Sequence, residues 1–437
     1  MPTIATHTLG CKLNFAETSH LVRQFVDAGY LVADFHDVAD IYVVNTCTVT
    51  AMAEKKCRMV IRQAVAQNPA AIVAVIGCFA QNAAADIARI PGVSLILGND
   101  LKHTLFSEVQ RLLAEPAPAL ANPTNPLFSQ QRTPDGTLAF SSGDRTRTFF
   151  KIQDGCDYFC TYCAIPFARG RSRSASIADT VDMARHIAES GTKEIVLTGV
   201  NTGTFGLHQG EQFIELLKRL DEVEGILRYR ISSIEPNLIT DQIIDFVAQS
   251  RAFLPHFHIP LQAGSDKVLK MMHRHYDTAL YASRIQHIKQ VMPHACIAAD
   301  VITGFNGEDD DTFQQSKAFI DSLPISYLHV FPYSDRPGTL ALKLPEKIAI
   351  PVRKARSQEL HELSDHKRKK FIDSQIGQSR SVLWEHTCHQ RDTMSLMEGW
   401  TDNYIRLQRP YSPTLAGTIT IHPIDLSTIV ENFSCED

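Results

Sequence analysis

Six of the ten cysteines fall into two groups of three, and these groups limit what the chain can become more than any other feature. One group lies within a single short run: Cys156, Cys160 and Cys163. The members of the other group are far apart, and each closes an apolar, strand-like run: Cys11, Cys47 and Cys78. Three thiolates can hold an iron–sulfur cluster and leave one iron free for a small molecule. Two such groups indicate a redox enzyme with two open clusters.

Length and composition predict a globular cytoplasmic protein of two or three domains. The chain has 437 residues, of which 44% are hydrophobic, enough for a sizeable core. Its net charge of -5 is too mild to attract nucleic acid over a long range. We expect no membrane contact, because the sequence has no apolar stretch long enough to span a bilayer. Cytoplasmic thiols stay reduced, so grouped cysteines point to metal binding or catalysis rather than to disulfides.

Alternating strand-like and helix-like runs over residues 3–112 predict a parallel sheet flanked by helices. The expected strands are 4–8, 41–45, 72–76 and 93–97, and the clearest helices are 15–28 and 51–67. We therefore assign residues 1–115 to an N-terminal α/β domain. Residues 116–144 are rich in Pro, Ala, Ser and Asn and are expected to be a linker.

A second alternating block follows the expected linker. Its strands are expected at 149–153, 194–200, 227–233, 257–261, 297–303 and 327–333. Helices are expected at 177–190, 213–223, 241–249, 278–291 and 312–322. Six strand–helix units are fewer than a closed eight-unit barrel needs. We expect a partial, open (β/α)6 barrel over residues 145–372, with its site at the carboxyl ends of the strands.

The last part of the chain changes character. Residues 352–372 predict one long polar helix that ends in the basic run Lys367-Arg-Lys-Lys. Short strands are then expected at 381–385, 404–407 and 417–421. Short strands divided by turn residues predict a small β-barrel over residues 376–437.

The spacing of the first cysteine group favours an iron–sulfur cluster over zinc. Cys156-x3-Cys160-x2-Cys163 follows the first strand of the barrel, where one short loop can point three ligands inward. Structural zinc normally has four ligands, and no fourth Cys or His follows at finger spacing. The ferredoxin pattern adds a fourth Cys followed by Pro, which is also missing here.

The second group is suggestive through its context rather than its spacing. Cys11, Cys47 and Cys78 each follow an expected strand of one parallel sheet. The carboxyl ends of parallel strands share one edge, so the three thiols can converge there. The alternative is three unrelated buried thiols, since free cysteine is often part of a core. Four cysteines belong to neither group and are expected to be bystanders: Cys57, Cys296, Cys388 and Cys435.

The spacing of Cys156, Cys160 and Cys163 resembles the signature of the radical S-adenosylmethionine (SAM) superfamily. In that superfamily the open iron of the cluster binds SAM, and an electron passed into the sulfonium yields a 5′-deoxyadenosyl radical. The resemblance places an aromatic residue near the adenine at the position of Tyr162. Simple packing is the alternative role for that ring.

Motifs along nearly the whole chain resemble the methylthiotransferase family of radical SAM enzymes. In the N-terminal half they are Leu9-Gly-Cys-Lys-Leu-Asn, Asn45-Thr-Cys-Thr-Val-Thr, Gly77-Cys-Phe-Ala-Gln and Lys151-Ile-Gln-Asp-Gly-Cys. Later ones are Ser232-Ser-Ile-Glu-Pro, Pro260-Leu-Gln-Ala-Gly-Ser, Thr303-Gly-Phe-Asn-Gly-Glu and Phe331-Pro-Tyr-Ser-Asp-Arg-Pro-Gly-Thr. They occur in the family's order, which is a cluster domain, a radical SAM domain and a small TRAM-type RNA-binding barrel.

This resemblance implies two 4Fe–4S clusters and a tRNA substrate. It assigns an auxiliary cluster to Cys11, Cys47 and Cys78, and the SAM-binding cluster to the other group. One SAM donates a methyl group to sulfur, and a second supplies the radical that activates a carbon–hydrogen bond. The expected partners are a tRNA anticodon stem-loop, a reducing electron donor of the flavodoxin or ferredoxin type, and a sulfur donor.

Among the branches, the resemblance favours methylthiolation of C2 of N6-threonylcarbamoyladenosine 37 in tRNA. The cues are Thr8-Leu-Gly-Cys-Lys-Leu-Asn and the run that begins at His329. The alternatives are the branch that acts on N6-isopentenyladenosine and the branch that modifies an aspartate of a ribosomal protein. Two further hypotheses are a radical SAM enzyme with one cluster, and an electron carrier or RNA-binding protein without SAM chemistry.

Residues at the expected carboxyl edge of the barrel are candidate SAM contacts. Thr198 and Gly199 end the second strand, and Gln262 and Ser265 follow the fourth. Glu235 follows the third strand and could accept hydrogen bonds from a ribose or an amino group. Its alternative role is to start a helix before a proline.

Histidines and basic residues outside these motifs receive weaker assignments. The histidines at 256, 258, 273 and 275 are expected to be packing residues, because no carboxylate or cysteine partner has a matching spacing. His386 and His389 are likewise expected to be incidental. RNA contacts depend on cations, and the expected ones are Lys367–Lys370, Arg169, Arg171, Arg173, Arg406 and Arg409.

Overall fold

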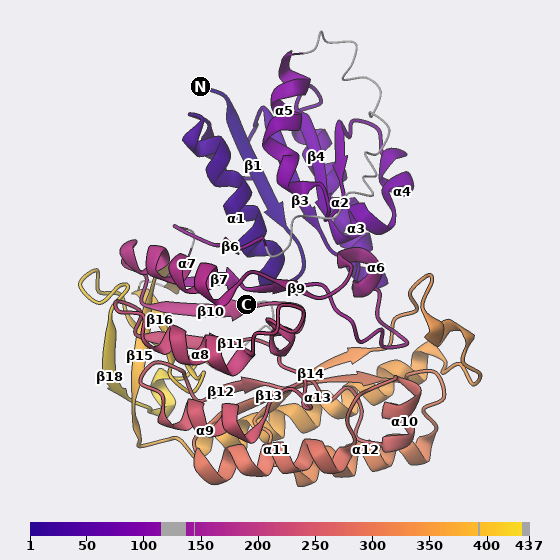
Figure 1. The fold of residues 1–437 in the computed structure, drawn as a ribbon, viewed down its shortest axis with the longest axis vertical. Coiled ribbons are helices and arrows are strands. Elements are labelled where there is room, and N and C mark those ends of the chain that lie inside the picture. The colour runs from indigo at the N-terminus through magenta and orange to yellow at the C-terminus, as the bar shows by residue number, and fades with distance from the viewer. Residues whose placement is uncertain (115–136, 144, 392–393, 431–437) are drawn as a thin grey trace.

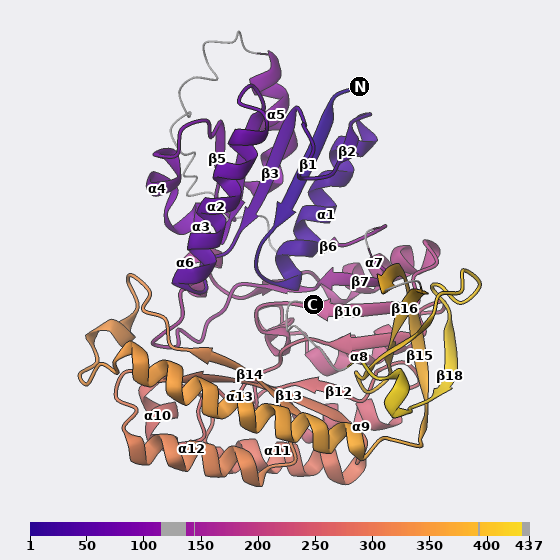
Figure 2. The same ribbon diagram turned by 180° about the vertical axis from the view of Figure 1, so that it is seen from behind.

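Three units make up the chain, and the first lies on the second (Figure 1). The computed structural model describes residues 1–114, 137–143, 145–391 and 394–430. An N-terminal sheet with helices on both faces stands over a larger barrel-like unit, and an antiparallel sheet flanks that unit (Figure 2). No helix in these ranges is both long and apolar enough to cross a membrane.

The N-terminal unit is the predicted parallel sheet, in the order β2-β1-β3-β4-β5. Its strands are β1 (Thr3–Thr8), β2 (Leu31–Ala33), β3 (Ile41–Thr46), β4 (Ile72–Gly77) and β5 (Leu95–Leu97). Its helices are α1 (Lys12–Asp27), α2 (Ala51–Gln67), α3 (Cys78–Asn82), α4 (Ala84–Ala88) and α5 (Leu105–Ala114), with a short 3-10 turn at Lys102–Thr104. Every residue of β3 and β4 is buried, because helices cover both faces of a parallel sheet.

The second unit confirms the predicted open barrel of six parallel strands. They run in the orders β7-β10-β11 and β12-β13-β14, and one bridge between Tyr229 and Phe253 joins the two halves. The strands are β7 (Arg147–Lys151), β10 (Glu194–Thr198), β11 (Arg228–Ile231), β12 (His256–His258), β13 (Cys296–Thr303) and β14 (Tyr327–Pro332). The outer helices are α7 (Ile177–Glu189), α8 (Phe213–Asp221), α9 (Asp241–Gln249), α10 (Asp266–Met271), α11 (Thr278–Val291) and α12 (Asp310–Ser322).

Short elements at the start of the barrel were not expected. Most of the predicted linker lies outside the described residues, but Ala139–Phe140 within it form β6, which pairs antiparallel with β7. After β7, the strands β8 (Gln153–Asp154) and β9 (Arg173–Ser174) pair with each other and enclose α6 (Ile165–Arg169). This excursion carries the first cysteine group.

The C-terminal part begins with the predicted polar helix, α13 (Ile350–Asp373), which packs on β14. An antiparallel sheet follows, in the order β17-β16-β15-β18. Its strands are β15 (Ser379–Arg391), β16 (Met394–Thr401), β17 (Arg406–Pro410) and β18 (Ile419–Pro423). The sheet is consistent with the predicted small β domain, and its closure into a barrel stays a prediction. Arg228 and Arg230 of β11 donate to the carbonyls of Trp400 and Thr401, which anchors the sheet to the barrel.

A buried charged network joins the N-terminal unit to the barrel. Glu17 of α1 accepts from Lys151 at 2.7 Å and pairs with Arg169 at 3.1 Å and with Lys102 at 2.5 Å. Asp154 pairs with the same Arg169 at 2.9 Å. Because Arg169 is only 2% exposed, the prediction that it contacts RNA is wrong. Its guanidinium instead holds the two units together.

Candidate active site

The three N-terminal cysteines lie at one edge of their sheet, as predicted. Cys11 follows β1 as the residue before α1, Cys47 follows β3 directly, and Cys78 follows β4 as the first residue of α3. The strands are parallel neighbours, so these positions share the carboxyl edge. The three cysteines are therefore neighbours along that edge, and Cys11 and Cys47 line one cleft.

Close packing holds this group in place. Gly10 adopts a φ of +101°, and a Cβ there would lie 2.9 Å from Cys47 Cβ, so only glycine fits. The side-chain amide of Asn99 donates to Cys78 Sγ at 3.4 Å. Cys57 lies beside Cys47 and donates to its carbonyl at 3.4 Å. This neighbour was expected to be a bystander, and it is buried in α2 rather than placed at a strand end.

The second group lies on the loop between β8 and α6. Gly155 opens the loop with a φ of +69°, and a Cβ there would lie 1.9 Å from the Arg171 carbonyl. The amide of Cys156 donates to the Gly170 carbonyl at 3.0 Å, which closes the base of the loop. A turn bond of 3.0 Å from the Cys163 amide to the Cys160 carbonyl brings the last two cysteines together.

Arg274 contacts the second cysteine group, and the sequence analysis did not single it out. Its guanidinium donates to Cys160 Sγ at 3.0 Å and to the Tyr162 hydroxyl at 3.4 Å. It also pairs with Glu235, so the predicted carboxylate at this edge is engaged by a cation. Arg274 lies in a turn after α10, far in sequence from both partners, and no local pattern marks it. Tyr162 packs edge-on against Phe305, and its place near an adenine stays a prediction.

The environment of both cysteine groups favours thiolates bound to a metal cluster over free thiols. Burial raises the pKa of Cys47 and of Cys163 to about 12. Such thiols stay protonated at neutral pH unless a cation is bound, and iron supplies that charge. Each group offers three sulfur ligands, which fits a cubane with one open iron. Both sets of residues therefore fit the cluster that the sequence suggested for them.

Removing the cation beside Cys160 should weaken turnover without unfolding the loop. Partners of metal ligands typically contribute about 10- to 100-fold to activity. We expect Arg274→Met to slow reductive cleavage of SAM by that factor, and Arg274→Lys to recover part of it. The measurement is the anaerobic rate of 5′-deoxyadenosine formation, with iron content as the control. A full rate at full iron content in Arg274→Met contradicts this role.

A cleft of about 610 Å³, here called the central cleft, lies between the N-terminal unit and the barrel. The N-terminal unit contributes the segment from His7 to Leu13, together with Cys47, Ala53 and Lys56. The barrel contributes strand ends and β14 residues: Thr198, Gly199, Ser232, Ser233, His256, His258, Asp300, Tyr327, His329 and Phe331. Tyr404 of the C-terminal sheet completes the wall. The cleft thus joins Cys11 and Cys47 to the carboxyl edge of the barrel.

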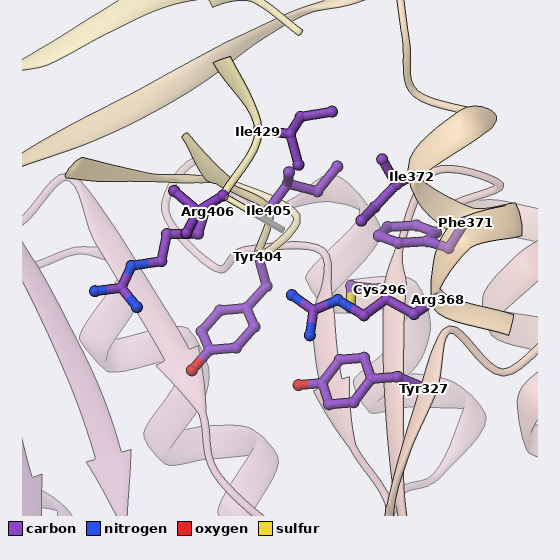
Figure 3. Close-up of a pocket in the computed structure, with 10 residues that line it drawn as sticks. Cys296, Tyr327, Arg368, Phe371, Ile372, Tyr404, Ile405, Arg406 and Ile429 are labelled. Carbon is purple, nitrogen blue, oxygen red and sulfur yellow. The ribbon is translucent and has the colours of Figure 1, made fainter. Parts of the chain in front are cut away.

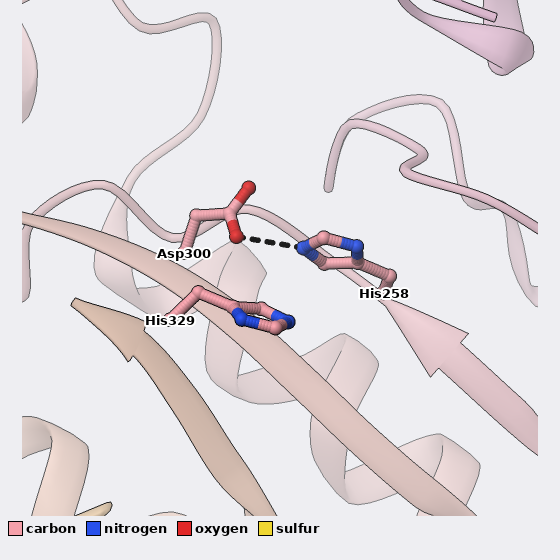
Figure 4. Close-up of side chains that lie close together, drawn as sticks. All are labelled: His258, Asp300 and His329. Carbon is pink, nitrogen blue, oxygen red and sulfur yellow. Dashed lines mark hydrogen bonds and ion pairs between the residues drawn. The ribbon is translucent and has the colours of Figure 1, made fainter. Parts of the chain in front are cut away.

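The reason given for the histidine prediction does not hold for His258, which does have a carboxylate partner, Asp300. Its Nε2 lies 2.7 Å from Asp300 Oδ1 on the neighbouring strand (Figure 4). Its Nδ1 lies 3.2 Å from Ser233 Oγ. His329, which pairs in register with Asp300, brings a second ring to within 5.1 Å. Ligand-type atoms of His258, Asp300 and His329 lie within 4.8 Å of one another. Both nitrogens of His258 already have protein partners, so we interpret the trio as a hydrogen-bonded cluster.

The other predicted SAM contacts lie at the expected edge. Thr198 is 2% exposed, and its hydroxyl has no hydrogen-bond partner among the described residues. Gly199 lies where a Cβ would come within 2.9 Å of Gln153 Oε1. Gln262 adopts a φ of 64°, and its backbone N–H donates to the backbone carbonyl of Asp300. Ser265 is the residue immediately before α10. Their contacts with SAM stay predictions.

The basic residues expected to contact RNA divide into buried and accessible ones. Lys367 is buried and donates to the carbonyls of Asp321 and Leu323, so its prediction is wrong. Arg368, on the same helix, lines a small cavity beside Tyr327 and Tyr404 (Figure 3). Several others remain accessible or half-buried: Arg171, Arg173, Lys369, Lys370, Arg406 and Arg409.

Family models match the N-terminal unit and the barrel. Residues 3–98 match a family described as uncharacterized protein family UPF0004. Residues 150–320 match the radical SAM superfamily. The first range contains Cys11, Cys47 and Cys78, and the second contains the loop with the other group.

Named relatives cover most of the chain. It is 39% identical over 409 residues to the threonylcarbamoyladenosine tRNA methylthiotransferase MtaB of Bacillus subtilis (strain 168), covering 93% of this chain and 90% of that protein. It is 31% identical over 390 residues to a tRNA-2-methylthio-N(6)-dimethylallyladenosine synthase of Nitratidesulfovibrio vulgaris (strain DP4), covering 88% and 86%. The fold resembles the radical SAM methyltransferase TsrM from Kitasatospora setae, with a TM-score of 0.53, 14% identity and coverage of 76% and 75%.

Proposed function

The chain belongs to the family of radical SAM methylthiotransferases, and we propose that it attaches a methylthio group to C2 of N6-threonylcarbamoyladenosine next to the anticodon of tRNA. The observation that carries this proposal is the pair of cysteine groups, one at the carboxyl edge of the N-terminal sheet and one on the loop between β8 and α6. The central cleft lies between the N-terminal sheet edge and the carboxyl edge of the barrel. Relatives named for this tRNA reaction are similar to the chain over nearly its full length.

Two 4Fe–4S clusters and SAM are the cofactors of this chemistry. We assign the auxiliary cluster to Cys11, Cys47 and Cys78, and the SAM-binding cluster to Cys156, Cys160 and Cys163. When bound, these groups supply the electron, the radical and the methylated sulfur that an unreactive aromatic C–H bond requires. The protein's part is to hold its ligands, to orient the base in the central cleft and to exclude water.

The lining of the central cleft favours a polar N6 substituent over an isopentenyl group. Its walls carry two lysines, three serine or threonine hydroxyls near the barrel edge, and the rings of His256, His258 and His329. Thr198 and His256 have polar atoms without a partner among the described residues. Burying a hydrocarbon chain against them would leave those hydrogen bonds unmade, which costs about 1–3 kcal/mol for each group. A threonylcarbamoyl group offers a carboxylate, a hydroxyl and a urea that can satisfy them.

The proposed domains and partners follow from this reaction. We assign residues 1–115 to the auxiliary-cluster domain, 116–144 to a linker, 145–372 to the radical SAM domain and 376–437 to a TRAM-like RNA-binding domain. A low-potential flavodoxin or ferredoxin would deliver the electron, and a separate sulfur donor would replace the sulfur that is transferred. We expect the reaction to take place in the cytoplasm, where the protein would meet its tRNA substrate.

The direct test is the nucleoside profile of tRNA from cells that lack this protein. Mass spectrometry should show loss of 2-methylthio-N6-threonylcarbamoyladenosine and accumulation of its unmethylthiolated precursor. Restoring the gene should restore the product. If the threonylcarbamoyl product persists while the methylthiolated isopentenyl nucleoside disappears, the substrate assignment is wrong and the second branch is correct.

A further inference from the structure

The central cleft carries more positive than negative charge. Two lysines line it, Lys12 and Lys56, against a single carboxylate, Asp300. The hydrogen bond of 2.7 Å from His258 already engages that carboxylate. An excess of fixed cations in a partly enclosed cleft favours an anionic ligand there.

Lys12 is the cation of this cleft that contacts the barrel. It is the first residue of α1 and is half-buried, and its ammonium lies 5.9 Å from the centre of the Phe149 ring. No carboxylate among the described residues lies within 4.0 Å of it. Burial lowers the pKa of His329 to about 4, and the charge of Lys12 adds to that effect. Lys12 and the barrel histidines His256, His258 and His329 line the same cleft.

Two buried polar side chains in the same cleft also lack partners. His256 is 8% exposed, stacks on Tyr404, and has no hydrogen-bond partner at either ring nitrogen among the residues that the structure describes. The buried Thr198 hydroxyl likewise has no hydrogen-bond partner among the described residues. Buried polar groups normally have a partner, so a polar ligand is the simplest source of the missing hydrogen bonds.

We propose that Lys12 binds the carboxylate of the threonylcarbamoyl group and so selects the hypermodified base over plain or isopentenylated adenosine. This inference rests on the proposed function. The carboxylate is the charged group that distinguishes this base from the alternatives, and a half-buried ammonium without an ion-pair partner matches it. A backbone phosphate would match the same charge, but every tRNA carries phosphates, so the two ligands give different selectivity.

The test compares the binding of two synthetic anticodon stem-loops to the reconstituted enzyme with SAM. One carries threonylcarbamoyladenosine at the target position, and the other carries plain adenosine. We expect Lys12→Met to weaken binding of the modified RNA about 10- to 100-fold, the loss of one charged hydrogen bond. Its affinity for the plain RNA should not change, and Lys12→Arg should retain most of the preference. Lys55→Met, an exposed lysine of α2 outside the cleft, is the matched control.

Each other outcome identifies a different error. Equal weakening for both RNAs means that Lys12 contacts a phosphate, and it overturns the inference. Loss of iron in both Lys12 variants means that the lysine supports the cluster at Cys11, and it also overturns the inference. If Lys12→Met keeps the wild-type preference for the modified RNA, the inference is overturned, but the proposed function is unaffected. A wild-type enzyme that neither prefers nor methylthiolates the modified RNA contradicts the proposed function itself.

Discussion

Replacing Cys47 by alanine should abolish the methylthiolated product while leaving reductive cleavage of SAM intact. Cys47 is one of three thiols at the N-terminal sheet edge, and two remaining thiols are too few to hold a stable cubane. The loop with Cys156, Cys160 and Cys163 belongs to the barrel and does not depend on Cys47. The measurement follows 5′-deoxyadenosine and the nucleoside product in one anaerobic reaction.

Cys57→Ala is the matched control for this substitution. Cys57 is also buried and hydrogen-bonds with the Cys47 backbone, but it points from the middle of α2. We expect this variant to form product at near the wild-type level. If Cys47→Ala still forms product, or if Cys57→Ala loses it, the assignment of the auxiliary ligands is wrong.

Glu17→Gln should destabilise the folded protein by about 3–5 kcal/mol, the usual effect of leaving buried charges without their partner. Glu17 faces three cations in the interface between the N-terminal unit and the barrel: Lys102, Lys151 and Arg169. The substitution leaves Asp154 as the one carboxylate that serves this buried set. Urea unfolding at neutral pH measures the change in free energy.

The surface pair of Glu215 and Lys218 provides the control, because both side chains are about half exposed. Glu215→Gln should change stability by about 0–1 kcal/mol, as exposed pairs do. An equal effect of the two substitutions would show that the buried network does not hold the units together.

The same network makes the stability depend on pH in a defined direction. Burial alone would raise the pKa of Glu17 and of Asp154, but the surrounding cations outweigh it and hold both pKa values well below their usual range. The stabilisation is therefore complete above the unfolded values of about 4 and is lost as the pH falls below them. Between about pH 6 and pH 3, wild type should lose more unfolding free energy than Glu17→Gln does.

Local sequence patterns predicted the regular elements well. The helices at 51–67, 241–249 and 278–291 were predicted at their observed bounds, because capping residues and apolar periodicity mark them. Besides the short strands β6, β8 and β9, the patterns missed two further strands, β2 and β16. β2 is a short edge strand whose first two residues are exposed, and β16 contains Gly399, which lies against the Trp384 ring. Neither has the alternating pattern of a half-buried strand.

The site was predictable where one motif or one sheet edge carries it, and not elsewhere. Both cysteine groups follow from spacing and from strand ends. Arg274 reaches Cys160 from 114 residues away, and Asp300 reaches His258 from 42 residues away. Such pairs exist only after folding, so no local pattern indicates them. Arg169 and Lys367 failed as RNA contacts for the same reason, because burial depends on distant segments.

Iron and sulfide content, with Mössbauer spectra, of the anaerobically reconstituted wild-type protein tests the two-cluster account most directly. The account predicts about eight irons per chain, all in 4Fe–4S form, and about four when Cys11, Cys47 and Cys78 are replaced together. A wild-type protein that binds only about four irons, with no change on that triple replacement, would contradict it.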